Sequence, residues 1–303
     1  MVRRSGPAGR APRRGTRSPW HAGAVDRNLT PAGGGAGPAL IPAFSPDWLA
    51  LREKADAAAR AVALLEPLRA VLPDALLVVH DLGCGTGSMG RWLAPLLPRP
   101  QRWVLHDRDP QLLARAAASI PAPAEIRAGD LTKLTARDLE GASLVTASAL
   151  LDLLTADEVD ALAEACTVAG CPALLTLSVA GQVGFTPPDP LDRRFAAAFD
   201  DHQRRETGGR RLLGPDAIEV TIEAFVRRGA IVHSRRSPWR LGPGELFRQW
   251  FRGWVDAACE QQPELQPYAA DYQCRRLGSE VVVGHVDLLA IGGAPCSTES
   301  GPG

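Results

Sequence analysis

The sequence of 303 residues is 45% hydrophobic and 22% charged, a composition typical of a globular protein with one large domain or two small ones. Lysine plus arginine and aspartate plus glutamate both total 34, so no net charge draws the chain toward nucleic acid or an anionic membrane. No apolar run approaches the roughly 20 residues of a membrane span. The six cysteines have no C-x-x-C or zinc spacing, which predicts no metal site and favours reduced thiols in a cytoplasmic protein.

Both ends of the chain differ in composition from its middle. Residues 1–40 are rich in arginine, glycine and proline, lack the hydrophobic segment of a secretory signal, and are expected to be a disordered tail. Residues 294–303 are expected to be a second disordered tail, which leaves 41–293 as the folded domain. Its first helix is expected to begin with Ser45 as N-cap and Pro46 at the first helical position, and to run to Pro67.

The most informative segment is a glycine-rich turn within residues 76–92, LLVVHDLGCGTGSMGRW. Its first four residues are apolar and predict a short strand buried on both faces, while a helical pattern begins after the glycines. Glycine allows positive φ angles and lets a ligand approach the backbone closely. The segment therefore predicts a ligand-binding turn between a strand and a helix. The residues expected to contact the ligand are Asp81, Gly83, Cys84, Gly85 and Gly87.

Two kinds of cofactor fit such a turn. Gly85-x-Gly87-x-x-Gly90 satisfies the dinucleotide pattern, in which a pyrophosphate lies over the helix N-terminus. Asp81, however, would repel a pyrophosphate and suits an amino-bearing ligand. The full pattern, Asp81-x-Gly83-x-Gly85-x-Gly87, resembles the first motif of the class I S-adenosylmethionine-dependent methyltransferases, and the sequence is similar to actinobacterial members of that family. The resemblance implies S-adenosyl-L-methionine as cofactor, with its amino-acid end over the turn. Arg52 of the first helix could reach the cofactor carboxylate, although a solvated arginine on a docking helix is the more common interpretation of such a residue.

A second acidic position ends the next predicted strand, Arg102–Asp107. Asp107 follows Gly87 by 20 residues, and a carboxylate at this offset accepts hydrogen bonds from ribose hydroxyls. Arg108 is expected beside the adenine, whereas Asp109 is expected to cap the following helix.

The resemblance implies further cofactor contacts after the third and fourth strands. Asp130 and Leu131 would lie near the adenine amino group, although an Asp130 that only caps its own turn is an equally good interpretation. Ala147 and Ser148 would line the cofactor next to its methyl group.

Strand and helix patterns alternate along the chain, which predicts an α/β fold. The resemblance implies a Rossmann-like sheet of seven mostly parallel strands with helices on both faces and an antiparallel last strand, Val281–Ile291, at its edge. The other strands are expected at 76–81, 102–107, 124–127, 142–147, 173–179 and 230–234, and the helices between them at 110–118, 156–168 and 216–228.

Two insertions, about 182–215 and 242–278, are expected to form a helical cap over the acceptor. In the second, Phe247, Trp250 and Trp254 share one helix face, a spacing that indicates core packing more than pocket lining. Asp152, which stands where many family members have histidine, and His202 are the candidate catalytic residues. A histidine suits a general base near neutral pH, although a lone histidine beside arginines is more often a surface residue.

These features predict in-line transfer of a methyl group to an O, N or C nucleophile of a small-molecule acceptor, with the enzyme mainly positioning the reactants and excluding water. Neither a nucleic-acid nor a membrane partner is expected, and the sequence makes no prediction of oligomeric state.

Two alternative functions remain open. One is an NAD(P)-dependent oxidoreductase that uses the glycine pattern, and the other is a non-catalytic domain that binds the cofactor or a protein partner.

Overall fold

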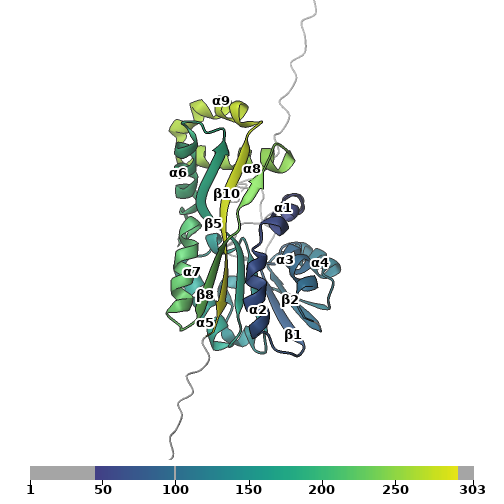
Figure 1. The fold of residues 1–303 in the computed structure, drawn as a ribbon. Coiled ribbons are helices and arrows are strands. Elements are labelled where there is room, and N and C mark those ends of the chain that lie inside the picture. The colour runs from purple at the N-terminus through teal and green to yellow at the C-terminus, as the bar shows by residue number, and fades with distance from the viewer. Residues whose placement is uncertain (1–44, 99, 293–303) are drawn as a thin grey trace, which may run out of the picture.

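A computed structural model describes residues 45–98 and 100–292 and contains a central eight-stranded sheet (Figure 1). Strands β1 to β5 run parallel to one another, and β10 runs antiparallel to β5, β8 and β9. The strands in spatial order are β3 (Ala124–Ala128), β2 (Gln101–Asp107), β1 (Leu77–Leu82), β4 (Leu144–Ser148), β5 (Ala173–Thr186), β10 (Glu280–Ile291) and β8 (Ile231–Arg236), with β9 (Trp239–Leu241) also paired to β10. This is the mixed, mostly parallel α/β sheet that the sequence predicts.

The position of β10 corrects one expectation, because this strand lies between β5 and β8 and not at the edge. Composition explains the difference. The second half of β10 is apolar except for Asp287, and Leu288 and Leu289 are buried on opposite faces of the sheet. Strand β8 carries Ser234, Arg235 and Arg236, which are all exposed, and such a strand suits the edge.

Helices cover both faces of the sheet. The α-helices are α1 (Pro46–Ala59), α2 (Leu65–Val71), α3 (Ser88–Leu93), α4 (Pro110–Ser119), α5 (Ala156–Val168), α6 (Asp192–Gln203), α7 (Ala217–Val226), α8 (Glu245–Gln261) and α9 (Gln266–Arg276). The 3₁₀ helices are η1 (Val62–Leu64), η2 (Ala94–Leu96), η3 (Leu131–Lys133), η4 (Ala136–Leu139), η5 (Leu151–Leu153), η6 (Gly214–Asp216) and η7 (Pro263–Leu265), and β6 (Glu206–Thr207) and β7 (Arg210–Arg211) form a separate hairpin.

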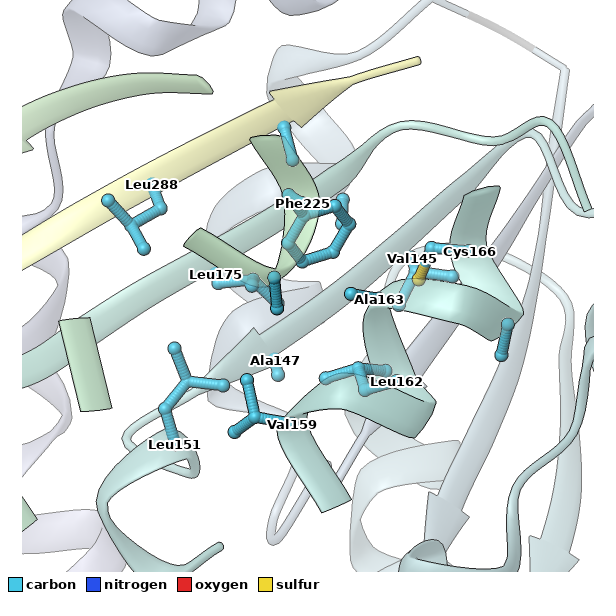
Figure 2. Packing of buried hydrophobic residues seen from close by; sticks show 14 of the residues in the cluster. Val145, Ala147, Leu151, Val159, Leu162, Ala163, Cys166, Leu175, Phe225 and Leu288 are labelled. Atoms are coloured by element: carbon cyan, nitrogen blue, oxygen red, sulfur yellow. The ribbon is translucent and has the colours of Figure 1, made fainter. Parts of the chain in front are cut away.

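Alternate residues of the central strands divide between two cores. Val145 and Ala147 of β4 face α5 and α7, as Figure 2 shows, together with Leu175 of β5. Leu144 and Leu174 face the opposite way and pack with residues of α2, α3 and α4. This alternation is the period of two expected of a strand covered on both faces.

A third core forms the cap. The distal parts of β5 and β10 extend beyond the rest of the sheet, and α6, α8 and α9 surround them (Figure 1). Phe247, Trp250 and Trp254 of α8 are each at most 3% exposed, so the core interpretation of this stripe is correct. Trp250 and Trp254 also border a cavity, described below.

The first helix begins as expected, since the Ser45 hydroxyl accepts a 3.2 Å hydrogen bond from the Trp48 amide. It ends earlier than expected, at Ala59 instead of Pro67. The buried Asp287 carboxylate on β10 accepts a 2.7 Å hydrogen bond from the Ala61 amide, which fixes the chain in a non-helical conformation there. The break turns the side chain of Arg60 into the protein.

Within the described ranges no helix has the length and apolar composition needed to cross a membrane. No cluster of three or more histidine, cysteine or acidic side chains that could hold a metal ion occurs in the same part of the chain.

Candidate functional site

The glycine-rich turn connects β1 to α3 at the carboxyl edge of the parallel strands. Gly85 and Gly87 have φ angles of 53° and 86°, a left-handed conformation that side chains disfavour. The Cys84 amide donates a 3.0 Å hydrogen bond to the carbonyl of His106, which ties the turn to the end of β2. A Cβ on Gly83 would lie 3.4 Å from Leu150 and 3.5 Å from Leu131, so these side chains border the start of the turn.

Asp107 ends β2 beside this turn. Its Oδ2 accepts a 3.0 Å hydrogen bond from the Gly85 amide, and its Oδ1 accepts one of the same length from the Asp109 amide. Asp109 caps α4 as predicted, accepting from the amides of Gln111 and Leu112. The half-buried Asp107 carboxylate is thus held against the glycine turn, and each oxygen keeps capacity for another donor.

Asp81 is almost fully buried at the end of β1. Its Oδ1 accepts a 2.8 Å hydrogen bond from the Thr146 hydroxyl, whereas its Oδ2 is buried without a hydrogen-bond partner among the described residues. Burial raises the pKa of Asp81 to about 7, although the hydrogen bond from Thr146 and the charge of Arg60 oppose the rise. A buried carboxylate oxygen with no donor is a position at which a ligand N–H group would be favourable.

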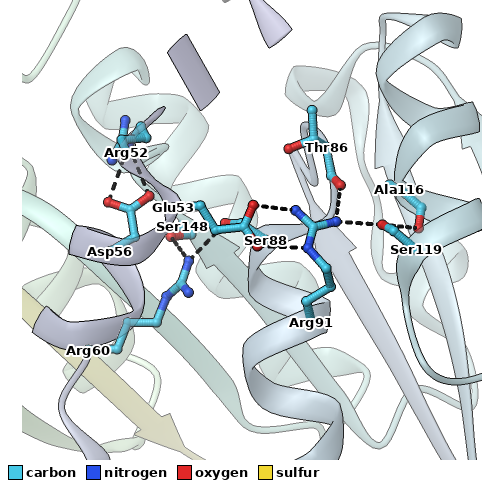
Figure 3. Close-up of polar contacts among 10 residues, drawn as sticks. All are labelled: Arg52, Glu53, Asp56, Arg60, Thr86, Ser88, Arg91, Ala116, Ser119 and Ser148. Atoms are coloured by element: carbon cyan, nitrogen blue, oxygen red, sulfur yellow. Dashed lines mark hydrogen bonds and ion pairs between the residues drawn. The ribbon is translucent and has the colours of Figure 1, made fainter. Parts of the chain in front are cut away.

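Arg60 is the cation whose charge acts on the Asp81 carboxylate. It was not identified from the sequence. Its Nη2 donates 3.1 Å hydrogen bonds to the hydroxyls of Ser88 and Ser148 (Figure 3). Its Nε and Nη1 are buried and have no partner in the described part of the chain. Burial lowers the pKa of Arg60, and the charges of Asp56 and Asp81 counteract this effect.

Arg52, expected at the cofactor carboxylate, has other partners. Its Nε is 2.9 Å from Asp56 Oδ2 (Figure 3). Its guanidinium carbon lies 5.0 Å from the centroid of the Trp239 ring. Asp56 also accepts a 3.1 Å hydrogen bond from the Trp239 indole. This group connects α1 to the cap, and the inward-facing cation is Arg60.

The remaining expected cofactor contacts lie around the same edge of the sheet. Asp130 caps η3, because its Oδ1 accepts hydrogen bonds from the amide and hydroxyl of Thr132, as the local interpretation predicts. Arg108 and Leu131 are half-buried. Ala147 is 1% exposed with its side chain in the core, so only its backbone is available to a ligand (Figure 2). Ser148 contacts Arg60, as described above.

A cavity of about 60 Å³ lies between the end of β4 and the cap, and we call it the cap pocket. Ala149 and Leu177 border it with φ angles of 52° and 57°, although neither is glycine. Backbone strain of this kind is concentrated at functional sites. The other residues that matter here are Arg52, Asp152, Asp200, Trp239, Trp250, Trp254 and His285.

Three titratable side chains of the cap pocket have perturbed acidities. Asp152 Oδ1 is buried without a described partner, and burial raises the pKa of Asp152 to about 6, with the nearby charge of Arg52 lowering it. Burial likewise raises the pKa of Asp200 to about 6. His285 Nδ1 is buried and unpartnered within the described residues, and burial together with Arg52 lowers the His285 pKa to about 3. The imidazole is therefore neutral near physiological pH.

Sequence reasoning identified Asp152 but missed Asp200 and His285. The only signal for His285 was a polar residue inside the apolar pattern of 281–291.

The other candidate catalytic residue, His202, lies away from these groups. It is 4% exposed in the last turn of α6, with Nε2 3.4 Å from a Glu260 carboxylate oxygen of α8 and Nδ1 2.9 Å from Arg205. It does not border the cap pocket. The structure therefore brings Asp152, and not His202, to the cap pocket.

Residues 79–169 match a family model described as a methyltransferase domain, a range that runs from β1 through α5. No curated protein sequence matches the chain.

Among solved structures, the chain is similar to a putative methyltransferase of Bacillus halodurans C-125, with 18% identity, a TM-score of 0.45, and coverage of 75% of this chain and 96% of that chain. It is also similar to the YcgJ protein of Bacillus subtilis, with 13% identity, a TM-score of 0.46, and coverage of 77% and 99%. The cyclopropane synthase MmaA2 of Mycobacterium tuberculosis shares 15% identity, with a TM-score of 0.40 and coverage of 76% and 83%. With identities below 20% and TM-scores below 0.5, these three likenesses carry no conclusion about activity.

Proposed function

We propose that the protein is a class I S-adenosylmethionine-dependent methyltransferase and that it methylates an O, N or C nucleophile of a small-molecule acceptor bound in the cap pocket. The observation that carries the proposal is the pair of buried, incompletely paired charges, Asp81 and Arg60, on either side of the glycine turn. An amino-acid group has the complementary charges, an ammonium and a carboxylate.

The residues around the turn fit S-adenosylmethionine in chemistry. Asp81 Oδ2 would accept from the ammonium, and Arg60 Nε and Nη1 would donate to the carboxylate, which satisfies the buried atoms that have no partner. Asp107 would accept from the ribose hydroxyls, while Arg108, Asp130 and Leu131 would border the adenine. We propose that the cofactor also contacts Gly83, Cys84, Gly85, Gly87, the backbone of Ala147, and Ser148. When bound, the cofactor supplies an electrophilic methyl group on a sulfonium. The sulfur is a good leaving group because it departs as a neutral thioether.

The task left to the protein is to position the acceptor and exclude water. The cap pocket opens beside Ala149, directly after the end of β4, and its aromatic walls keep water from the nucleophile. Asp152 borders the pocket at the same end and would accept the proton that the acceptor loses. A pKa of about 6 leaves this carboxylate ionised at neutral pH and able to act as a base.

We further propose that 41–293 form one catalytic domain, with the insertions 182–215 and 242–278 as the acceptor cap. The contacts of α6 with α8 in one aromatic core support this division. A cytoplasmic location is also part of the proposal.

Calorimetric titration of the full-length protein with S-adenosylhomocysteine, alongside NADH, tests the proposal. We expect micromolar affinity for S-adenosylhomocysteine and no binding of NADH. Binding of NADH alone would favour the oxidoreductase alternative. Binding of S-adenosylhomocysteine without methylation of any acceptor in broad small-molecule extracts would favour the non-catalytic alternative.

A further inference from the structure

The cap pocket contains two carboxylates, Asp152 and Asp200, that form no ion pair within the described ranges. Asp152 comes from η5, which follows the carboxyl end of the central strand β4, and Asp200 comes from α6 of the cap. Oδ1 of Asp152 is buried without a hydrogen-bond partner, and no ion pair with Asp200 occurs among the described residues. The two carboxylates therefore face one cavity from different layers of the protein.

The other groups that face the pocket do not neutralise this charge. Arg52 is the one described cation on its wall, and it pairs with Asp56 at 2.9 Å while stacking on Trp239. His285 is 6% exposed, and its Nδ1 has no partner in the described ranges. A neutral imidazole with a free nitrogen offers a lone pair to a ligand N–H group. The pocket is therefore negative and rich in acceptors.

The walls between these groups are aromatic. Trp239, Trp250 and Trp254 border the cavity, and the centroids of Trp250 and Trp254 lie 5.8 Å apart in a stacked arrangement. Indole faces attract cations, and the attraction is stronger in a site with little water. A volume of about 60 Å³ corresponds to about two water molecules at their liquid volume, so the enclosed part of a ligand is small and slender.

We propose that the acceptor is an amine that binds in the cap pocket as an ammonium ion, between the carboxylates of Asp152 and Asp200 and against the tryptophan rings. This inference rests on the proposed methyl transfer and specifies its acceptor class. An anion would be repelled by both carboxylates, and a neutral alcohol would leave them uncompensated.

The reaction at this site would be N-methylation. One N–H proton of the ammonium moves to the Asp152 carboxylate, which leaves a lone pair on nitrogen. The lone pair forms the N–C bond to the sulfonium methyl as the C–S bond breaks, and the electron pair of that bond stays on sulfur as a thioether. Release of the proton from Asp152 to water restores the carboxylate, and the product is a methylated amine.

Three probes of equal length and different charge test the inference: n-butylamine, n-butanol and n-butyrate. Each is titrated by ligand-observed NMR against the full-length protein saturated with S-adenosylhomocysteine. We expect n-butylamine to bind at least tenfold more tightly than the other two. Asp152→Asn and Asp200→Asn should each weaken amine binding at least fivefold.

Asp201→Asn is the matched control, because Asp201 neighbours Asp200 on α6 but has a side chain that is 65% exposed and 3.7 Å from Arg204. It should leave amine binding unchanged, and all three variants should keep the wild-type affinity for S-adenosylhomocysteine, which also reports correct folding. Equal binding of the three probes, a preference for butyrate, or no binding of any probe would overturn the amine inference while leaving methyl transfer in place. Failure of S-adenosylhomocysteine to bind would instead overturn both proposals.

Discussion

The Thr146 hydroxyl donates a 2.8 Å hydrogen bond to Asp81 Oδ1 across β4 and β1, whose parallel register sets these two residues opposite each other. The bond orients the carboxylate and leaves Oδ2 as the oxygen without a donor. The pKa of about 7 shows that burial outweighs the stabilising effects of Thr146 and Arg60 on the ionised form. An ammonium group beside Oδ2 would supply the missing stabilisation, which is why this site suits a cationic ligand group.

Comparing two ligands, with and without the amino-acid group, should separate the roles of the charges around the glycine turn. Asp81→Asn and Arg60→Gln should each weaken S-adenosylhomocysteine binding at least tenfold, about 1.4 kcal/mol, because each removes a partner of the amino-acid group. Neither should affect 5′-methylthioadenosine, which lacks that group. Asp107→Asn should weaken both ligands by a similar factor, because both contain the ribose. Calorimetry measures all six affinities, and unchanged values for Asp81→Asn and Asp107→Asn together would refute the site assignment.

The glycine turn and the Asp107 position were predictable because they depend on neighbouring residues in the sequence. A strand, a glycine pattern and an acidic residue at a fixed offset are local signals. Likewise, Ser45 and Asp109 were identified as helix caps from the residues that follow them.

Arg60, Asp200 and His285 could not be predicted in the same way, because contacts between distant segments determine their positions. Arg60 lies at the end of α1, where Asp287 of β10, more than 200 residues later, accepts a hydrogen bond from the Ala61 amide, and Ser88 and Ser148 accept from its guanidinium. His285 reaches the cap pocket because β10 lies inside the sheet instead of at its edge.

Asp152 should control the pH dependence of methyl transfer. Its pKa is raised to about 6, so the carboxylate is protonated below that pH and unable to accept a proton. We expect kcat/KM for n-butylamine methylation to fall as the pH decreases through about 6. Asp152→Asn should lower kcat by about 10²–10⁴ and abolish the acid limb of kcat, whereas the contribution of Asp200 to the acid limb of kcat/KM should remain.

Asp200→Asn provides the comparison, because Asp200 also titrates near pH 6 in the same pocket. It should raise KM while kcat and its acid limb remain close to wild type, as expected of a residue that binds the ammonium without accepting its proton. An acid limb in kcat that persists in Asp152→Asn would show that another group is the base.

The buried histidine pair should make the fold sensitive to acid. His80 Nδ1 lies 3.1 Å from His106 Nε2, and burial lowers the pKa of both residues to about 4. Between pH 6.5 and about 4, the unfolded chain binds protons that the folded protein does not, so stability decreases as the pH falls through this window. The loss is at most about 1.4 kcal/mol per pH unit for each histidine.

His106→Gln should reduce the slope of the free energy of unfolding against pH by the contribution of about one proton. Urea denaturation at several pH values measures this slope. At pH 8 the pH dependence of the variant and the wild type should coincide, because both histidines are neutral in the folded and unfolded states. Identical slopes below pH 6.5 would show that the pair does not titrate on unfolding.

Two adjacent arginines on α9 should differ sharply in their effect on the cap. The buried Arg276 donates to both oxygens of Asp192, at 2.7 and 2.8 Å, and lies over the rings of Phe185 and Tyr272. Arg276→Gln would leave the Asp192 carboxylate buried without its cation, so we expect a loss of about 3–5 kcal/mol in the free energy of unfolding.

Arg275 is the matched control, because its side chain is 49% exposed and its ion pair with Asp189 is open to solvent. Arg275→Gln should cost at most about 1 kcal/mol. Urea denaturation of both variants measures this difference, and equal costs would contradict a buried ion pair in the cap.

Because the glycine turn lies outside the cap core, Arg276→Gln should also lose n-butylamine binding more readily than S-adenosylhomocysteine binding as urea is added.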